Sequence, residues 1–164
     1  MLDYIRIGCA VPPVQVADVK QNVQDICDKI AEAEMAGCDV VAFPELALTG
    51  YTCADLFFQK NLLDAAAAGL VQLVAYSRKF PALTVAVGMP MVIGGQMYNC
   101  GVVIAGGKVC GIVPKTFLPN YKEFYEQRWF ASSINLSNNT IHLCGQTVPC
   151  DPNMLCDTSD TCIA

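Results

Sequence analysis

A short, continuously apolar run at residues 40–43 constrains the fold of this chain more than any other feature. The run does not alternate between polar and apolar residues, which is typical of an interior strand covered on both faces. The residue that follows is Pro44, which cannot donate to a sheet ladder and excludes helical angles from the residue before it. We therefore expect the strand to end at Phe43. Glu45 then lies just beyond the end of the strand, partly desolvated, where a carboxylate can act as a general base. Taken alone, the segment fits a plain strand exit with a solvated Glu45 equally well.

The residues before this run predict a β-α-β unit. Residues 5–11 form an apolar run that ends at two prolines, which indicates a buried first strand. Asp18, with Gln21 three residues later, resembles a capping box, and Gly37 is a typical helix stop, so we expect a helix over residues 18–36. The apolar residues between them follow helical spacing: Val19, Val23, Ile26, Ile30 and Ala33.

The rest of the chain mixes helical and hairpin patterns. An Ala-rich segment with spaced leucines predicts a second helix over 61–80, closed by Pro81, and residues 83–88 predict a third strand. Two further strands, 91–104 and 109–113, are expected around paired-glycine turns. After Trp129 the chain becomes polar and gives two short strand-like pieces, 141–144 and 161–164. The predicted fold class is α/β in a single domain, with covered parallel strands and hairpins in one sheet.

The composition narrows the choice of partner. The 164 residues are 54% hydrophobic and only 15% charged, which is more apolar than a typical self-contained domain, so we expect something beyond this chain to cover part of its surface. The net charge of −5, without any Lys/Arg run, argues against nucleic acid or an anionic membrane as partner. No secretion-type start and no long apolar stretch is present, so we expect a cytoplasmic location.

Ten cysteines are present, and we expect reduced, mostly buried thiols. They occur mainly inside apolar runs, as do Cys9, Cys27, Cys38, Cys100 and Cys110. Four more recur at every sixth residue, Cys144, Cys150, Cys156 and Cys162, with His142 nearby. Zinc ligand pairs lie two to four residues apart, so this spacing argues against a metal site, and His142 is expected in a strand or loop rather than as a catalyst.

A second segment carries candidate chemistry. Lys115 follows Pro114 at a predicted strand end, so it is expected at the same sheet edge as Glu45, where an ammonium can stabilise an oxyanion. Glu126 lies in an aromatic-rich loop that can bring it close by. Considered singly, a solvated lysine and a glutamate on a helix surface explain these two residues as well.

Together the two segments resemble the nitrilase superfamily. FPELALTGY (residues 43–51) resembles the block with the catalytic glutamate, and PKTFLPN (114–120) followed by FYEQRWF (124–130) resembles the block with the lysine and second glutamate. The motifs LPNY at 118–121 and GYTCADLF at 50–57 are similar to those of the glutaminase domains of glutamine-dependent NAD(+) synthetases. The resemblance spans nearly the whole chain. It implies an α-β-β-α sandwich of which residues 1–164 form the N-terminal part, incomplete at the C-terminus.

The resemblance also implies a reaction and its partners. The expected activity is thiol-dependent hydrolysis of the glutamine side-chain amide. In it Glu45 is the general base, Lys115 stabilises the oxyanion and Glu126 supports them, while Tyr121 is a candidate substrate-binding residue. The freed ammonia passes to a synthetase domain of the same polypeptide, absent here, which uses ATP and Mg²⁺ to amidate deamido-NAD. No cofactor is expected in this chain itself, and a homo-oligomer is expected.

The sequence departs from the family pattern at the nucleophile. No cysteine after Lys115 has the expected context, and residues 161–164 look like the strand that leads to it. We therefore expect the nucleophilic cysteine beyond Ala164, an inactive chain on its own, and self-association through its uncovered end. Cys156, which precedes Asp157, is the least poor candidate within the chain. Two alternatives stay open: another nitrilase-like amidase or carbamoylase, and a non-catalytic interaction subunit.

Overall fold

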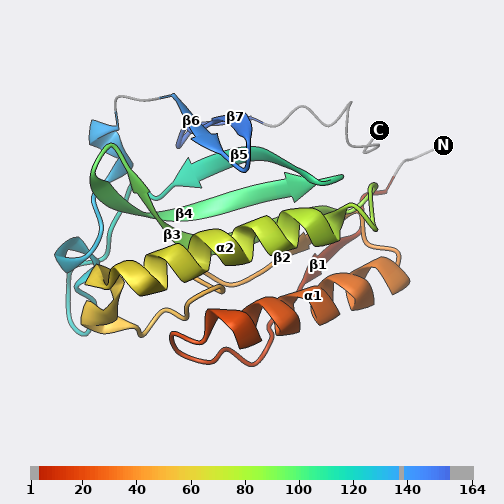
Figure 1. The fold of residues 1–164 in the computed structure, drawn as a ribbon, viewed down its shortest axis with the longest axis horizontal. Coiled ribbons are helices and arrows are strands. Elements are labelled where there is room, and N and C mark those ends of the chain that lie inside the picture. Colours follow the sequence, from red (N-terminus) through yellow and green to blue (C-terminus); the bar gives the residue numbers. More distant parts are fainter. Residues whose placement is uncertain (1–3, 137–138, 156–164) are drawn as a thin grey trace.

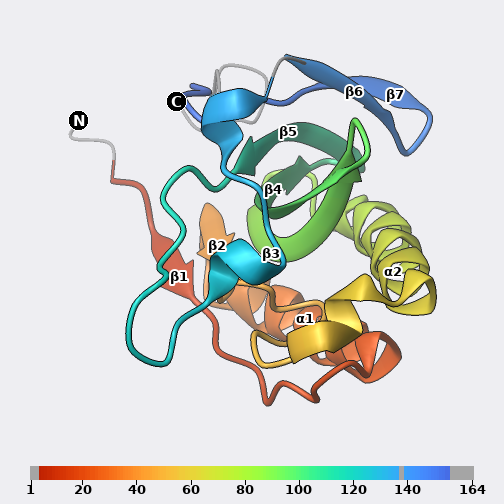
Figure 2. The same cartoon turned by 90° about the vertical axis from the view of Figure 1, so that its left-hand side faces the viewer.

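A computed structural model describes residues 4–136 and 139–155 as a mixed five-stranded sheet with two long helices on one of its faces (Figures 1 and 2). The sheet order is β1-β2-β3-β4-β5, and a separate two-stranded hairpin, β6-β7, lies against β5. The predicted α/β fold class is confirmed. The strands and helices are β1 Ile7–Cys9, α1 Val19–Met35, β2 Val40–Ala42, α2 Lys60–Ser77, β3 Thr84–Ile93, β4 Gln96–Ala105, β5 Lys108–Pro114, β6 Thr140–Leu143 and β7 Gln146–Pro149. Short 3₁₀ turns span Ala54–Phe58, Glu126–Arg128 and Ser133–Asn135.

Strand direction brings two distant loops to one end of the sheet. Strands β1, β2 and β3 are parallel, β4 is antiparallel to β3, and β5 is antiparallel to β4. Strand β5 therefore runs in the same direction as β2. The residues that follow β2 and the residues that follow β5 consequently emerge at the same edge, although some seventy positions separate them in the chain.

Helix α1 forms largely as its sequence predicts. All five residues of the expected apolar face are buried, and Asp18 accepts a hydrogen bond from the Gln21 backbone N–H at 3.1 Å. The reciprocal half of the expected capping box is absent, because the Gln21 side chain instead donates to Asp25 at 2.9 Å. The helix ends at Met35, just before Gly37. One side-chain cap and one apolar stripe are therefore sufficient to define this helix.

The prediction of a buried first strand is wrong. Ile7 in β1 is 65% exposed and Cys9 is exposed as well. The apolar residues make this strand suitable for burial. In the folded sheet, however, β1 is an edge strand that pairs with β2 alone. Sheet order is a long-range property that a run of apolar residues does not encode.

The third strand is longer than expected, because it does not end at Gly88 but continues to Ile93. Pro90 lies within it, opposite Asn99 of β4. Strand β2 pairs only with residues as far as Ala86, so at Pro90 no strand partner on that side requires an N–H donor. Helix α2 is shorter than expected, since it ends at Ser77 and Pro81 lies beyond a short turn. The two paired-glycine hairpin turns are confirmed.

The C-terminal part adds a small hairpin over the sheet (Figure 2). The expected strand at 141–144 is shifted by one residue to Thr140–Leu143, with His142 exposed within it. Its partner β7 was not predicted, and a bridge between Ile112 and Cys150 joins this region to β5. The predicted strand at 161–164 lies outside the described residues. The hairpin therefore packs the C-terminal part of the described chain against β5 of the main sheet.

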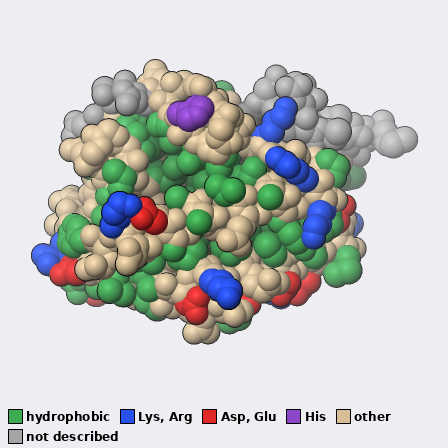
Figure 3. Space-filling view, in the orientation of Figure 1, with side chains coloured by type: hydrophobic (Ala, Val, Ile, Leu, Met, Phe, Trp, Pro, Cys, Tyr) green, Lys and Arg blue, Asp and Glu red, His purple; other side chains and the backbone are tan. Residues whose placement is uncertain are grey.

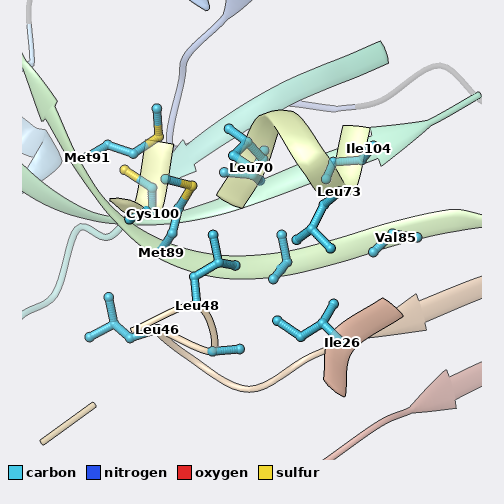
Figure 4. Close-up of a cluster of buried hydrophobic side chains, with 14 of the residues drawn as sticks. Ile26, Leu46, Leu48, Leu70, Leu73, Val85, Met89, Met91, Cys100 and Ile104 are labelled. Atoms are coloured by element: carbon cyan, nitrogen blue, oxygen red, sulfur yellow. The ribbon is translucent and has the colours of Figure 1, made fainter. Parts of the chain in front are cut away.

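Apolar side chains from both helices, the sheet and the loop after β2 form one core (Figure 4). Leu46 and Leu48, which flank Ala47 just after Glu45, are fully buried in it. The surface seen in Figure 3 shows few, scattered charged side chains among apolar and neutral ones, as the composition leads one to expect. No helix in the described part of the chain has the length and hydropathy needed to cross a membrane.

Candidate active site

The loop after β2 fixes Glu45 in place through its neighbours. The backbone N–H of Phe43 still donates to Ala86 of β3 at 2.9 Å, and that of Leu48 donates to Gly88 at 3.2 Å. Between them Leu46 adopts a left-handed conformation with φ of 52°. Such a conformation costs free energy for a residue with a side chain, and the burial of Leu46 offsets that cost. The Glu45 side chain, by contrast, points outward and is 41% exposed.

Gly88 of β3 is the residue that lets this loop lie on the sheet. A Cβ atom at Gly88 would stand 2.4 Å from the Leu46 backbone nitrogen and 2.9 Å from the Pro44 carbonyl oxygen. Both neighbours are backbone atoms, which cannot rotate away as a flexible side chain can. The position of Glu45 therefore depends on a glycine more than forty residues further along the chain.

Lys115 directly follows β5 and its backbone is held on both sides. Its N–H donates to the Asn99 carbonyl oxygen at 2.8 Å, and its carbonyl oxygen accepts from the Ser133 N–H at 3.1 Å. Its ammonium nitrogen Nζ lies 2.7 Å from Glu45 Oε1 and 3.0 Å from Glu126 Oε1. The prediction that Glu45 and Lys115 converge at one sheet edge is confirmed, and Glu126 joins them.

The charge state of Lys115 follows from this arrangement. Burial by itself lowers the pKa of the Lys115 ammonium, but hydrogen bonds and charges from Glu45 and Glu126 outweigh that effect and raise the pKa. A raised pKa keeps the ammonium protonated through the physiological range. An ammonium has three N–H donors, of which the two carboxylates use two. The third can be offered to a developing oxyanion.

Glu126 is buried, with only 1% of its side chain exposed, so the alternative of a glutamate on a helix surface is wrong. Its Oε1 accepts from Lys115 and from the Tyr51 hydroxyl at 2.8 Å, while Oε2 has no hydrogen-bond partner within the described residues. Burial, the hydrogen bond to Glu126 and the two nearby carboxylates raise the pKa of Tyr51. Tyr51 therefore stays a neutral donor to Glu126.

An exposed clamp holds the loop around Glu126. Arg128 donates from Nε and from an Nη to the two carboxylate oxygens of Asp55, at 2.7 and 2.8 Å, and Trp129 Nε1 donates to Asp55 at 3.0 Å. These hydrogen bonds keep the pKa of Asp55 well below its usual range. Asp55 belongs to the 3₁₀ turn that follows the Glu45 loop, so the clamp ties the two loops of the site together.

Asn99 is the site residue that the sequence argument missed. It lies in β4, is 4% exposed, and its side-chain Nδ2 donates to Glu45 Oε1. The available signal was an amide in the interior of a strand of mostly apolar residues, where a buried polar side chain needs a partner. That signal does not identify the partner, because it lies 54 positions away.

An open cleft of about 340 Å³ reaches the carboxylate–ammonium cluster. Its lining combines apolar strand residues with the polar groups of the site: Phe43, Glu45, Gly88, Asn99, Val113 and Lys115. Tyr121, the candidate substrate-binding residue, is 63% exposed and packs on Phe124, with ring centroids 5.8 Å apart. Phe124 in turn contacts Tyr51. Tyr121 thus lies on the aromatic side of the site and contacts none of the three charged residues through a hydrogen bond.

The described cysteines offer no activated thiol at the cleft. Cys100 and Cys150 are buried free thiols, and burial raises the pKa of each, which opposes formation of a thiolate. Cys156 and Cys162 lie outside the described residues. Across residues 4–136 and 139–155, no group of three His, Cys, Asp or Glu side chains is arranged to hold a metal ion.

Comparison with known proteins agrees with this geometry. Residues 6–149 match the family of carbon-nitrogen hydrolases, and the chain belongs to that family. The glutamine-dependent NAD(+) synthetase of Mycobacterium tuberculosis is 34% identical over 157 residues, which cover 96% of this chain and 23% of that protein. The corresponding Aquifex aeolicus protein is 37% identical over 115 residues, or 70% of this chain and 20% of its own length.

Solved structures give the same result. The crystal structure of a glutamine-dependent NAD(+) synthetase from Cytophaga hutchinsonii has a TM-score of 0.83 and 34% identity, over 91% of this chain and 25% of that one. An amidase from Nesterenkonia sp. has a TM-score of 0.67 at 20% identity, over 87% of this chain and 53% of its own, which shows a shared fold. The resemblance to the nitrilase superfamily and to NAD(+) synthetases is therefore confirmed. The chain spans about a quarter of the length of these synthetases.

Proposed function

We propose that this chain is the N-terminal part of a glutaminase domain, in which Glu45 and Lys115 hydrolyse the side-chain amide of glutamine. The observation that carries the proposal is the contact of 2.7 Å between Lys115 Nζ and Glu45 Oε1 at the mouth of the cleft. A base and an oxyanion-stabilising cation lie side by side there, as amide hydrolysis requires. The named activity of the relatives that match at 34% identity supports glutamine as the substrate.

In the proposed reaction a cysteine thiol beyond Ala164 forms a bond to the amide carbon while Glu45 takes its proton. The carbonyl electrons move onto oxygen, where the unused N–H of Lys115 stabilises the negative charge. Glu45 then protonates the leaving nitrogen, so that ammonia departs and a thioester remains. Water, deprotonated by Glu45, attacks the thioester, and glutamate leaves as the thiol regains its proton.

Glu126 has a supporting role in this scheme. Buried and bound to Lys115 and Tyr51, it holds the ammonium at the cleft from the side opposite to solvent. Tyr121 is proposed to contact the substrate from the side of the site where it packs on Phe124.

A cytoplasmic location is proposed as well. It agrees with the buried free thiols of the described residues, which are Cys27, Cys53, Cys100 and Cys150.

We further propose that the ammonia is consumed by a synthetase domain of the same polypeptide. Such a domain would use ATP and Mg²⁺ to amidate deamido-NAD, and a homo-oligomeric assembly is expected. The support is that the matched relatives are NAD(+) synthetases of about four times this length.

The test supplies the intact gene product with amide-¹⁵N-labelled glutamine, deamido-NAD, ATP and Mg²⁺. The proposal predicts ¹⁵N in the carboxamide of the NAD that forms, together with one glutamate per NAD or more. Hydrolysis of simple aliphatic amides in preference to glutamine would instead identify an amidase. If neither glutamine nor any other amide is cleaved, the interaction-subunit alternative is correct and the proposed activity is wrong.

A further inference from the structure

We propose that Asn99 is a positioning residue that determines which oxygen of Glu45 takes the proton. The proposal rests on the glutaminase site described above and adds a residue to it. Asn99 Nδ2 and Lys115 Nζ both donate to the same atom, Glu45 Oε1. Neither donates to Oε2, and within the described residues no other hydrogen bond reaches that oxygen. Oε2 is therefore assigned as the atom that accepts and returns the proton.

The two donors differ in what they fix. Lys115 brings a positive charge that moves with a long, flexible side chain, whereas Asn99 is neutral and 4% exposed in the middle of the sheet. A buried amide on a strand has few rotamers available, so its Nδ2 defines one direction for the bond to Oε1. With Oε1 held from this side, the carboxylate cannot exchange its two oxygens by rotation without the loss of a hydrogen bond to a charged group.

Asn99 also contacts Lys115, but through its main chain. Its carbonyl oxygen accepts the Lys115 backbone N–H at 2.8 Å, a contact that every substitution at position 99 retains. Substitution of the side chain therefore removes the bond to Glu45 and leaves the backbone support of Lys115 in place. This separation makes the role of the amide testable.

The experiment compares Asn99→Ala and Asn99→Asp in the intact protein and measures glutamate release from glutamine as a function of pH. Loss of a hydrogen bond to a charged group predicts a decrease of about ten- to a hundredfold in kcat/KM for Asn99→Ala. The acid limb of the rate profile moves to higher pH, because the ionised carboxylate has lost a donor. In Asn99→Asp it moves further, since a second negative charge stands where the amide donated.

Ser77→Ala is the matched control. Ser77 is 1% exposed, donates to Val74 at 2.9 Å and accepts from the Gly107 N–H at 3.0 Å, and none of these three residues lines the cleft. Ser77→Ala removes a buried polar group, as Asn99→Ala does. Its profile of rate against pH should keep the acid limb of the wild type. The melting temperature checks folding in every variant. If the variants at Asn99 keep the wild-type kcat/KM and acid limb, the proposal is overturned.

A crystal structure of the intact wild-type and Asn99→Ala proteins tests the same point without activity. The proposal predicts that the Glu45 carboxylate turns or moves away from its wild-type position once the amide is absent. A carboxylate that keeps its orientation in Asn99→Ala overturns the proposal. If the wild-type protein releases no glutamate, the proposed function fails, and these two structures still decide whether Asn99 positions Glu45.

Discussion

Glu45 and Glu126 share one ammonium but occupy opposite environments. Each carboxylate has one oxygen without a hydrogen bond to the described residues, but Glu45 is 41% exposed at the cleft, whereas Glu126 is 1% exposed and binds Lys115 and Tyr51 through its other oxygen. A group that moves protons must reach the substrate, while a group that holds a cation works best where water does not screen its charge. The comparison teaches that exposure, rather than residue type, distinguishes the two carboxylates, and the proposed function assigns proton transfer to the exposed one and support to the buried one.

The largest effect is expected from Lys115→Ala, which removes the partner of both carboxylates. Glutamine hydrolysis should fall by at least about a hundredfold, as when an oxyanion donor is lost. Stability should fall by about 2–3 kcal/mol, because Glu126 is left buried without a positive partner. Melting of the intact protein measures this loss, and Lys60→Ala, which breaks the exposed pair with Asp64, should leave melting nearly unchanged.

A second substitution sharpens that result. If the unpaired charge of Glu126 causes the loss of stability, then Lys115→Ala combined with Glu126→Gln should regain most of the stability but none of the activity.

The stability that Lys115 contributes should depend on pH with a definite sign. Because the pKa of Lys115 is raised, this stability is fully present below about pH 10.4 and is lost as the pH rises through the folded-state pKa. A wild-type melting temperature that stays constant as the pH rises far above about 10.4 would contradict the ion-pair account.

Gly88→Ala is expected to have the next largest effect. The added Cβ would stand 2.4 Å from the Leu46 nitrogen, so the loop that carries Glu45 must move, at a cost of about 1–3 kcal/mol. Gly101, which pairs with Gly88 across the hairpin, is the control, because a Cβ there meets its nearest atom at 3.9 Å. Equal melting temperatures for the two alanine variants would show that the loop does not depend on Gly88.

Tyr51→Phe should have a moderate effect. It removes one of the two donors to Glu126 Oε1, which should cost about 1.5 kcal/mol and lower glutaminase activity less than Lys115→Ala does. Tyr98→Phe is the control: Tyr98 is buried and Tyr51 partly buried, but the Tyr98 hydroxyl donates to the uncharged Gln96. The account requires the loss in melting temperature to be greater at Tyr51 than at Tyr98.

Asp55→Asn should have the smallest effect, since its clamp to Arg128 is exposed and screened by salt. Hydrogen bonds from Arg128 and Trp129 lower the pKa of Asp55, so its contribution to stability is present above about pH 4 and is lost as the pH falls below that. The difference in melting temperature between wild type and variant should therefore be constant from neutral pH to about pH 5 and shrink in more acidic solution. A difference that grows on acidification would contradict the clamp.

Much of the site could be predicted from local patterns. Pro44 and Pro114 mark strand ends, and parallel strands in one sheet bring the residues after those ends to one edge, so the meeting of Glu45 and Lys115 followed from the sequence. The apolar stripe of α1 and the paired-glycine turns were equally local signals. Each depends on contacts within a few residues, which a sequence displays directly.

The missed features are those set by long-range packing. The exposure of Ile7 depends on the position of β1 in the sheet, and the partner of Asn99 depends on the register of β4 against β3 and β5. The requirement for Gly88 arises because a distant loop folds over it. No periodicity encodes such contacts, since they form only when the whole sheet is assembled.

The most direct test sets Glu45→Gln beside Glu126→Gln in the intact protein, with glutamate release from glutamine as the measured rate. Synthesis of NAD from free ammonia checks the proposed synthetase domain in each case, and the melting temperature checks the folding of the substituted domain. The account predicts that Glu45→Gln loses glutamine hydrolysis by about a hundredfold or more, while Glu126→Gln keeps at least about ten times the rate of Glu45→Gln. If Glu126→Gln is as slow as Glu45→Gln or slower, the division of roles between the exposed and the buried carboxylate is wrong.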